Sequence, residues 1–435
     1  MTEVPGFLAI GLGATRRCRL ALFALTAVAG AVSCLFYAPV GANHPNAGGG
    51  EMIAVAENLV RYGYFGNPSP GRYTGATAVV APAYPFFLAI LLKLFGPHCG
   101  RLWVVVFAAV VHGVHAALLI PLSRVVFRDQ SPGVWAAVFT VVFPVVRFMP
   151  AWEAIFAASG LLAFCLTVAR WISGRHFSSL RALALGVMSG LLVLVNPVAA
   201  LVAVVWTAFR LLAYWKALTR PFMSVACFGL ALCVTPLPWA IRNQVLLGAP
   251  VIKSGLGWNL YASNNDCAES SLARNFWTGC YDKHTGAREV DLVCQMGELK
   301  YNAYRRQTAV DWITANPRAF FYLTVHRVFE FWFPNMAEGP YAVMISFITI
   351  LSLAGFVLMA RWRESFLQFA ICASLVYPLT YYVVLSDSRY RIPILWISLL
   401  GAGYFMQAVW RLCPRWRTTH KNRKPIAAVT LPPGS

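Results

Sequence analysis

Long apolar runs separated by short basic clusters dominate this chain from residue 20 to residue 410. The runs are continuous rather than alternating, so they predict helices and not the strands of a β-barrel. A membrane-spanning helix needs about 20 mostly apolar residues, and the chain supplies about ten such runs. This pattern predicts an all-α polytopic membrane protein. The expected spans are residues 20–39, 102–123, 132–149, 154–171, 182–195, 197–214, 222–240, 341–360, 366–385 and 390–410.

The basic clusters predict how the chain is oriented. Arg16, Arg17 and Arg19 precede the first run, so the positive-inside rule places the N-terminus in the cytoplasm. No convincing cleavage site follows, which indicates an uncleaved signal anchor. The same rule places the basic C-terminal tail in the cytoplasm. The chain then divides into a cytoplasmic N-terminus at 1–19, a transmembrane module at 20–240 with an outer segment at 40–101, an outer segment at 241–340, C-terminal spans at 341–410 and a cytoplasmic tail at 411–435.

The segment 82–96 is apolar but short. It has about 15 residues and is interrupted by Lys93, whereas a span needs about 20. If it crossed the membrane, the basic clusters that follow would all lie outside, against the positive-inside rule. We therefore predict a juxtamembrane helix on the outer surface.

Composition excludes several classes of protein. Hydrophobic residues make up 59% of the chain and charged residues 12%, against about 25% charged residues in soluble domains. A water-soluble enzyme and a disordered chain are both excluded. The net charge of +20 would indicate nucleic-acid binding in a soluble protein, but here the basic residues follow the topology. We therefore expect a lipid bilayer, and no nucleic acid, as a partner.

The 11 cysteines show no metal-ligand spacing with one another or with histidine, which disfavours a structural zinc site. We expect no cofactor; a divalent metal is an open alternative that no acidic pair in the sequence supports. Cys267, Cys280 and Cys294 lie in the outer segment 241–340, where an oxidising compartment would permit one disulfide. The odd count leaves the pairing open.

A recognisable order of residues begins with an acid in the first outer segment. Glu51 opens an amphipathic stretch, and Thr77-Ala78, Ala81-Pro82-Ala83-Tyr84-Pro85 and Leu94-Phe95-Gly96 follow it. This order resembles the bacterial GT-C glycosyltransferases of the protein-mannosyltransferase and aminoarabinose-transferase type, glycosyltransferase family 39. In that family an acidic residue of the first outer loop precedes a juxtamembrane helix.

Three later stretches agree with this resemblance, which covers residues 20–410 in the right order. The family usually has Asp where this chain has Glu51, and no second acid pairs with it nearby in the sequence, so a metal-dependent variant is disfavoured. The stretches are Phe143-Pro144 followed by Glu153, Pro238-Trp239-Ala240-Ile241-Arg242-Asn243 followed by Lys253-Ser254 and Asn264-Asn265, and Asp387-Ser388-Arg389-Tyr390-Arg391-Ile392-Pro393.

The resemblance implies an inverting glycosyltransferase that moves a sugar from a polyprenyl-phosphate donor to an acceptor on the periplasmic face of a bacterial inner membrane. The layout of the chain fits this chemistry, because both outer segments lie where a lipid-borne donor presents its phosphate. The leaving phosphate needs positive charge, and the acceptor hydroxyl needs one carboxylate base. The sequence identifies neither the sugar nor the acceptor, which could be a glycan, a lipid or a protein.

Two carboxylates are the catalytic candidates, Glu51 as the base and Glu153 as its orienting partner. Glu51 follows three glycines, and its alternative role is to favour the positive N-terminus of the helix that it opens. Glu153 lies at the outer mouth of two spans, and its alternative is a structural ion pair with Arg147. We expect neighbouring basic residues to keep either carboxylate ionised.

Basic residues on the outer face are exceptions to the positive-inside rule and indicate an anionic ligand. Arginine binds phosphate with two parallel hydrogen bonds, although it also reaches lipid headgroups without a specific site. The candidates for binding the donor phosphate are Arg242, Lys253, the pair Arg389 and Arg391 acting as a unit, and His44.

Two other functions share this topology. A non-enzymatic transporter or flippase of lipid-linked sugars usually shows internal repeats and polar sites in the middle of the membrane, whereas the notable charges here cluster at one face. A polymerase of surface glycan repeats would lack the order of motifs described above.

Overall fold

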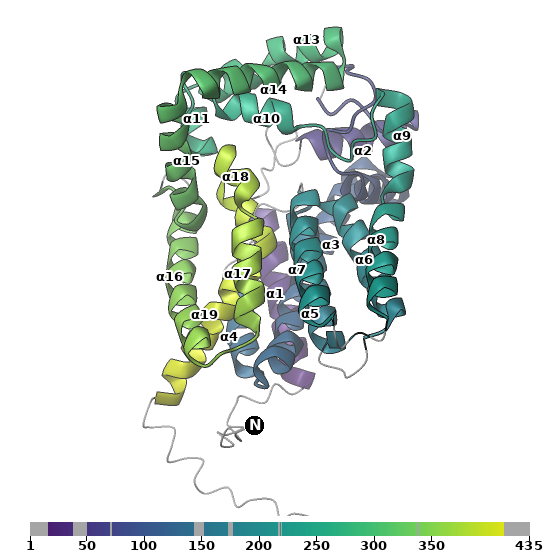
Figure 1. Ribbon diagram of the computed structural model, residues 1–435. Coiled ribbons are helices and arrows are strands. Elements are labelled where there is room, and N and C mark those ends of the chain that lie inside the picture. Colours follow the sequence, from purple (N-terminus) through teal and green to yellow (C-terminus); the bar gives the residue numbers. More distant parts are fainter. Residues whose placement is uncertain are drawn as a thin grey trace, which may run out of the picture.

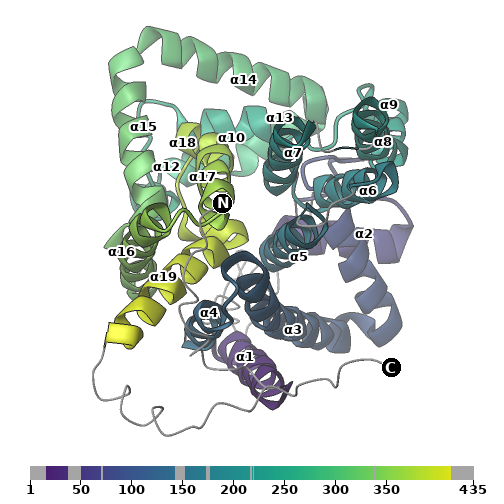
Figure 2. The ribbon, with the colours of Figure 1, turned by 60° about the horizontal axis from the view of Figure 1, so that its bottom comes forward.

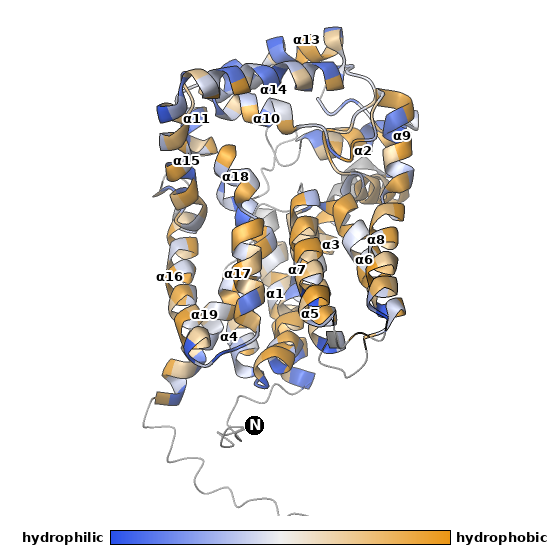
Figure 3. Ribbon diagram, viewed as in Figure 1, coloured by the Kyte–Doolittle hydropathy of each residue, from blue (hydrophilic) through white to orange (hydrophobic). Residues whose placement is uncertain are grey.

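The computed structural model describes residues 16–37, 50–69, 72–142, 152–172, 177–215, 218, 220–336 and 339–412, and their regular elements are all helices. Apolar helices stand side by side in a bundle whose surface is hydrophobic (Figures 1 and 3). The bundle helices are α1 (Arg16–Tyr37), α3 (Ala83–Phe127), α4 (Ser131–Val142), α5 (Ala154–Ile172), α6 (Ser179–Val195), α7 (Pro197–Ala213), α8 (Pro221–Val234), α16 (Pro340–Arg361), α17 (Phe366–Val376) and α19 (Ile392–Leu412).

Shorter and more polar helices cover one end of the bundle, as Figures 1 and 3 show. We call α2 and α10–α14 the cap layer. The end of α19 at Leu412 lies at the opposite end of the bundle. The cap-layer helices are α2 (Gly50–Tyr62), α10 (Leu256–Ser263), α11 (Leu272–Trp277), α12 (Cys280–Thr285), α13 (Ala287–Met296) and α14 (Glu298–Ala315); the linking helices are α9 (Leu237–Leu247), α15 (Pro317–Trp332), α18 (Leu379–Val383) and the short 3-10 helix η4 (Ser388–Arg391).

Among the described residues, five helices are long and apolar enough to cross a membrane, and a bent pair, α8 and α9 at 41°, would make a sixth. Four shorter apolar helices accompany them. The structure therefore supports a polytopic membrane protein, while the count of about ten spans stays a prediction. The five long helices cover Leu102–Phe127, Ala154–Trp171, Tyr341–Arg361, Phe366–Val383 and Ser388–Leu412, and the shorter ones cover Ala83–Gly96, Ser131–Val142, Ser179–Val195 and Pro197–Ala213.

The break predicted at the end of the segment 82–96 is present within α3. Gly96 has a φ of 76° and a ψ of 167°, so the chain changes direction there before the long span begins at Leu102. Such a positive φ is favourable for glycine and strained for other residues. The short helix before Gly96 is therefore a separate apolar element, and its predicted place on the membrane surface stays a prediction.

The glycine pair Gly186 and Gly190 brings α6 against α8. A Cβ at Gly186 would lie 2.4 Å from the carbonyl oxygen of Phe228, and one at Gly190 would lie 2.5 Å from the Cβ of Thr235. Small residues allow such close approach of helix backbones within membranes.

The Gly186→Ala variant should therefore be destabilised, because α6 and α8 must move apart to admit one methyl group. We expect a loss of about 1–3 kcal/mol, seen as a lower midpoint of thermal unfolding in detergent. Gly229→Ala is the matched control, since a Cβ at Gly229 on α8 meets no atom within 4 Å. Equal midpoints for the two variants would contradict this packing.

Candidate functional site

Glu51 lies in the first turn of α2 and has an intermediate exposure. Burial raises the pKa of its carboxyl above the usual range, and the positive charges of Lys253 and Arg389 oppose this shift. The negative charges of Glu153 and Glu298 raise the pKa further. The cations are present as expected from the sequence, but burial outweighs their effect on Glu51, which corrects the expectation that they dominate.

Four of the predicted residues therefore lie close enough for their charges to act on one carboxyl. Glu51, Glu153, Lys253 and Arg389 come from α2, the start of α5, the segment after α9, and η4. These segments are far apart in the sequence and meet where the cap layer faces the bundle. We call these four residues the central cluster.

Glu153 is 8% exposed and is held by a side chain that the sequence analysis did not single out. The Nδ2 of Asn196 donates to Glu153 Oε1 at 3.2 Å, while Asn196 Oδ1 accepts from the backbone N–H of Ala199 and caps α7. The signal for this cap is the Asn196-Pro197 pair between two apolar runs. The alternative partner, Arg147, lies outside the described residues.

The guanidinium of Arg389 lies beside two aromatic rings. Its guanidinium carbon is 4.4 Å from the ring centre of Trp152 and 5.2 Å from that of Tyr390. Asp387 pairs with its Nε at 3.5 Å, and this Nε is buried without a hydrogen bond. Tyr381 stacks on the far side of Tyr390 at 4.7 Å. These contacts hold Arg389 close enough to Glu51 for its charge to act on that carboxyl.

Arg391 is not brought to the central cluster. It is 1% exposed, and its guanidinium donates to the carbonyl of Trp332 at 2.8 Å, to Thr349 Oγ1 at 2.5 Å and to Ser398 Oγ at 2.9 Å. Residues two apart in a 3-10 helix point to different sides, about 240° apart at three residues per turn. Arg389 and Arg391 therefore do not form the unit that the sequence predicted.

The guanidinium of Arg242 is engaged by backbone carbonyl groups. It donates to the carbonyls of Thr77 at 2.8 Å and Phe65 at 2.5 Å, and its guanidinium lies over the ring of Trp239 at 4.8 Å. These contacts hold the turn between α2 and α3, a structural role that the geometry favours over phosphate binding. His44 lies outside the described residues, so its role stays a prediction.

Lys253 is exposed, and its neighbour Ser254 fixes its backbone. The N–H of Ser254 donates to the carbonyl of Ala78 at 2.8 Å, and its hydroxyl donates to Glu298 Oε1 at 2.6 Å. Lys253 therefore extends an exposed ammonium group from a fixed segment, close enough to Glu51 for its charge to act on that carboxyl. This arrangement suits the binding of an anionic ligand.

Glu298, at the start of α14, joins the two outer segments. It is 7% exposed and accepts hydrogen bonds from the Thr77 hydroxyl, from the N–H of Ala78 at 2.8 Å and from the Ser254 hydroxyl at 2.6 Å. No local pattern predicts this role, because the partners of Glu298 lie 44 and more than 200 positions away.

The disulfide left open by the sequence joins Cys267 to Cys280, with 5.8 Å between their Cα atoms. Cys294 is a free and exposed cysteine. Within the described residues, one group of three potential metal ligands comprises Cys267, Cys280 and His284. Metals bind cysteine as a free thiolate, so the disulfide removes two of these three ligands.

An apolar groove of about 600 Å³ lies beside Arg242, where α2, α3, α6 and α9 meet. Arg242 is its charged lining residue, and it links the groove through Thr77 to Glu298 beside the central cluster. The groove is lined by Leu59, Gly63, Tyr64, Phe65, Pro82, Ala83, Phe86, Leu194, Thr235, Pro238, Trp239, Arg242 and Leu246.

Comparison with known proteins shows a similarity in structure but none in sequence. No family model matches this chain, and no curated protein matches it. The chain is similar to the crystal structure of the oligosaccharyltransferase of Archaeoglobus fulgidus in its apo form, with a TM-score of 0.56 and 13% identity. The similarity covers 95% of this chain and 53% of that one, so this chain spans about half the length of the archaeal enzyme.

Two further structures of the archaeal enzyme agree. One is tethered to an acceptor peptide containing the NVT sequon, with a TM-score of 0.55 and 13% identity over 95% of this chain and 52% of that one. The other, AglB in complex with an inhibitory peptide and a dolichol-phosphate, has a TM-score of 0.51 and 14% identity over 95% and 52%.

At this identity the likeness concerns the fold alone, which is similar to about half of the archaeal oligosaccharyltransferase. The resemblance to glycosyltransferase family 39, taken from the sequence motifs, stays a prediction.

The Glu298→Ala variant should loosen the junction of the two outer segments, since three buried donors lose their acceptor. A buried donor left unpaired costs about 1–3 kcal/mol, so we expect the unfolding midpoint in detergent to fall clearly. Asp311→Ala is the control, because Asp311 lies on the same helix, is exposed and accepts a single exposed hydrogen bond. A Glu298→Ala protein as stable as the Asp311→Ala protein would contradict the role assigned to Glu298.

Proposed function

We propose that this chain is a membrane glycosyltransferase that transfers a sugar from a polyprenyl-phosphate donor to an acceptor at the cap end of the bundle. The observation that carries the proposal is the central cluster, in which two carboxylates and two cations from four distant segments meet at one end of an apolar bundle. The likeness of the fold to an oligosaccharyltransferase supports it, as does the dolichol-phosphate bound in one of the archaeal structures.

The donor phosphate is proposed to lie between Lys253 and Arg389. Both cations act on the same carboxyl, so an anion that approaches Glu51 reaches both of them. Charge on the phosphate grows as the bond to the sugar breaks, and fixed cations stabilise that charge. The apolar groove behind Arg242 offers a surface for the prenyl chain close to this position.

Glu51 is proposed as the base that takes the proton of the acceptor hydroxyl. A base works best when its pKa lies near the operating pH, and burial moves the pKa of Glu51 in that direction. Glu153, held by Asn196, is proposed to orient the acceptor or the base. Attack from the side opposite the phosphate inverts the anomeric centre.

The orientation is part of the proposal. The cap layer lies on the periplasmic face of a bacterial inner membrane, and both termini lie in the cytoplasm. The support comes from the basic clusters in the sequence and from the position of the cap layer at one end of the bundle, opposite Leu412 (Figure 1).

A transporter of lipid-linked sugars is the second candidate function. The 41° bend between α8 and α9 favours it, since transporters often contain broken spans. A labelled polyprenyl-phosphate sugar separates the two: release or transfer of the sugar by the purified protein supports the enzyme, and movement of intact donor across vesicles supports the transporter.

The Glu51→Gln variant keeps the size and the hydrogen bonds of the side chain but accepts no proton. We expect turnover of the labelled donor to fall at least about 100-fold while donor binding survives. Glu57→Gln, on the same helix, is the control and should turn over normally. If Glu51→Gln is active and Glu153→Gln is inactive, the two roles are reversed.

The pH profile of turnover reports on the same carboxyl. Because Glu51 must be ionised to act as a base, activity should fall as the pH drops through its raised pKa. The charge of Lys253 lowers that pKa, so Lys253→Met should move the acidic limb of the profile to higher pH. Lys300→Met, on the exposed side of α14, should leave the limb in place. A limb that stays fixed in Lys253→Met would argue against Glu51 as the titrating group.

The Arg389→Gln variant should weaken binding of the donor. A charge-assisted hydrogen bond is worth about 1.5–3 kcal/mol, which corresponds to a loss of roughly tenfold to over a hundredfold in affinity. The control is Arg318→Gln at an exposed position of α15. Unchanged donor affinity in well-folded Arg389→Gln protein would contradict binding of the donor phosphate by Arg389.

Removal of divalent cations tests whether a metal takes part. We expect full activity in the presence of a chelator, because the proposed step uses a carboxylate base and fixed cations. Loss of activity that added Mn²⁺ or Mg²⁺ restores would assign Glu51 and Glu153 to a metal instead.

A further inference from the structure

The disulfide between Cys267 and Cys280 fixes the helix that carries Tyr281. Helix α12 begins at Cys280, so Tyr281 is the residue directly after the cross-linked position. The ring of Tyr281 packs against Phe276 of α11, with ring centres 4.4 Å apart. Helix α12 packs against α10, α11 and α13, and Figure 2 shows it in the same part of the view as α15 and α18. The backbone of Tyr281 is therefore held from two sides.

The segment before α12 is tied to the segment that carries Arg389. The N–H of Leu272 donates to the carbonyl of Ser386 at 2.8 Å, and the N–H of Ser386 donates to the carbonyl of Ser270 at 2.9 Å. Ser386 stands three positions before Arg389. These hydrogen bonds fix α11 and α12 relative to η4.

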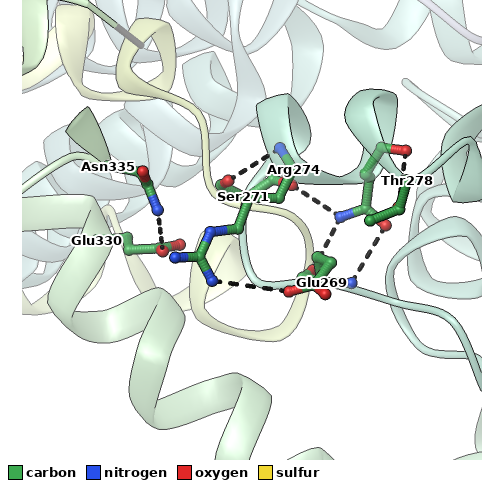
Figure 4. A network of polar contacts seen from close by, with 7 residues as sticks. Glu269, Ser271, Arg274, Thr278, Glu330 and Asn335 are labelled. Carbon is green, nitrogen blue, oxygen red and sulfur yellow. Dashed lines mark hydrogen bonds and ion pairs between the residues drawn. The ribbon is translucent and has the colours of Figure 1, made fainter. Parts of the chain in front are cut away.

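Further polar contacts stiffen this junction, and Figure 4 shows them. Asn275 donates to the carbonyls of Glu269 at 2.9 Å and Ser271 at 2.7 Å, and the Ser271 hydroxyl accepts from the N–H of Arg274. Arg274 pairs with Glu269 at 3.8 Å and points between Glu269 and Glu330 (Figure 4).

The phenol of Tyr281, on a helix tied through α11 to the segment that carries Arg389, lies within electrostatic range of the central cluster. The charges of Glu51 and Arg389 both act on it, as does the phenol of Tyr390. Burial raises the pKa of Tyr281 well above its usual value, so the phenol stays protonated and is a hydrogen-bond donor. Its place beside Arg389 puts a neutral donor next to a cation, a combination that suits a phosphate oxygen.

We propose that Tyr281 donates a hydrogen bond to a phosphate oxygen of the lipid-linked donor, and that the Cys267–Cys280 disulfide positions it for this contact. The inference rests on the proposed function and names a further ligand of the same site. Tyr281 touches the substrate, whereas Cys267 and Cys280 act through it. Binding of the donor then depends on the oxidised state of this cysteine pair.

The test measures binding of a short-chain polyprenyl phosphate to the full-length protein in detergent. Tyr281→Phe keeps the ring and the disulfide and removes only the hydroxyl, and we expect affinity to fall about tenfold. The C267S/C280S double variant should weaken binding by a similar or smaller factor. In a Tyr281→Phe background the same two serine substitutions should cause no further loss. Cys294→Ser, which removes a free cysteine of the same layer, is the control and should bind as the wild type does.

A disulfide with a purely structural role would weaken binding equally in both backgrounds, so an equal loss overturns the positioning role. If C267S/C280S does not fold, Tyr281→Phe alone decides the phosphate contact, and wild-type affinity in that variant overturns the inference. When the wild type binds polyprenyl phosphate and Tyr281→Phe binds it equally well, only this inference fails. When the wild type itself binds none, the proposed function fails with it.

Discussion

A single buried carboxylate, Glu298, joins the two outer segments on which the central cluster depends. It accepts hydrogen bonds from Thr77 and Ala78 of the first segment and from Ser254 of the second. The residue before Ser254 is Lys253, and the turn that contains Thr77 connects α2, which carries Glu51, to α3. A charge buried without partners is costly, so loss of these hydrogen bonds would destabilise the junction of the two segments. Glu298 thereby ties the segment that follows the helix of Glu51 to the segment that carries Lys253.

Desolvation has the largest effect on the pKa of Glu51. A carboxylate in water beside two cations would have a lowered pKa, but desolvation outweighs the two cations at Glu51 and raises its pKa. The same desolvation strengthens the electrostatic interactions of the other charged groups, including Arg389 beside Trp152 and Tyr390. In the proposed reaction, the two cations bind the donor phosphate and the raised pKa of Glu51 suits it to accept a proton from the acceptor hydroxyl.

The sequence predicted the elements better than the directions of side chains. Continuous apolar runs and basic clusters predicted an all-helical membrane protein, and the motif order predicted that Glu51, Glu153, Lys253 and Arg389 lie together. Arg391 shared every one of these signals with Arg389, yet its side chain points away, because the pattern of charges carries no information on the turn of a 3-10 helix. Glu298 and Tyr281 were missed because contacts across more than 200 positions leave no local pattern.

The most direct test of this arrangement is the structure of the chain with a polyprenyl-phosphate sugar bound. We expect the phosphate within about 3 Å of the guanidinium of Arg389 and the ammonium of Lys253, the usual length of a charge-assisted hydrogen bond. The anomeric carbon of the sugar should face the carboxyl of Glu51. A phosphate bound elsewhere, with Glu51 out of reach of the sugar, would contradict the central cluster as the site of transfer.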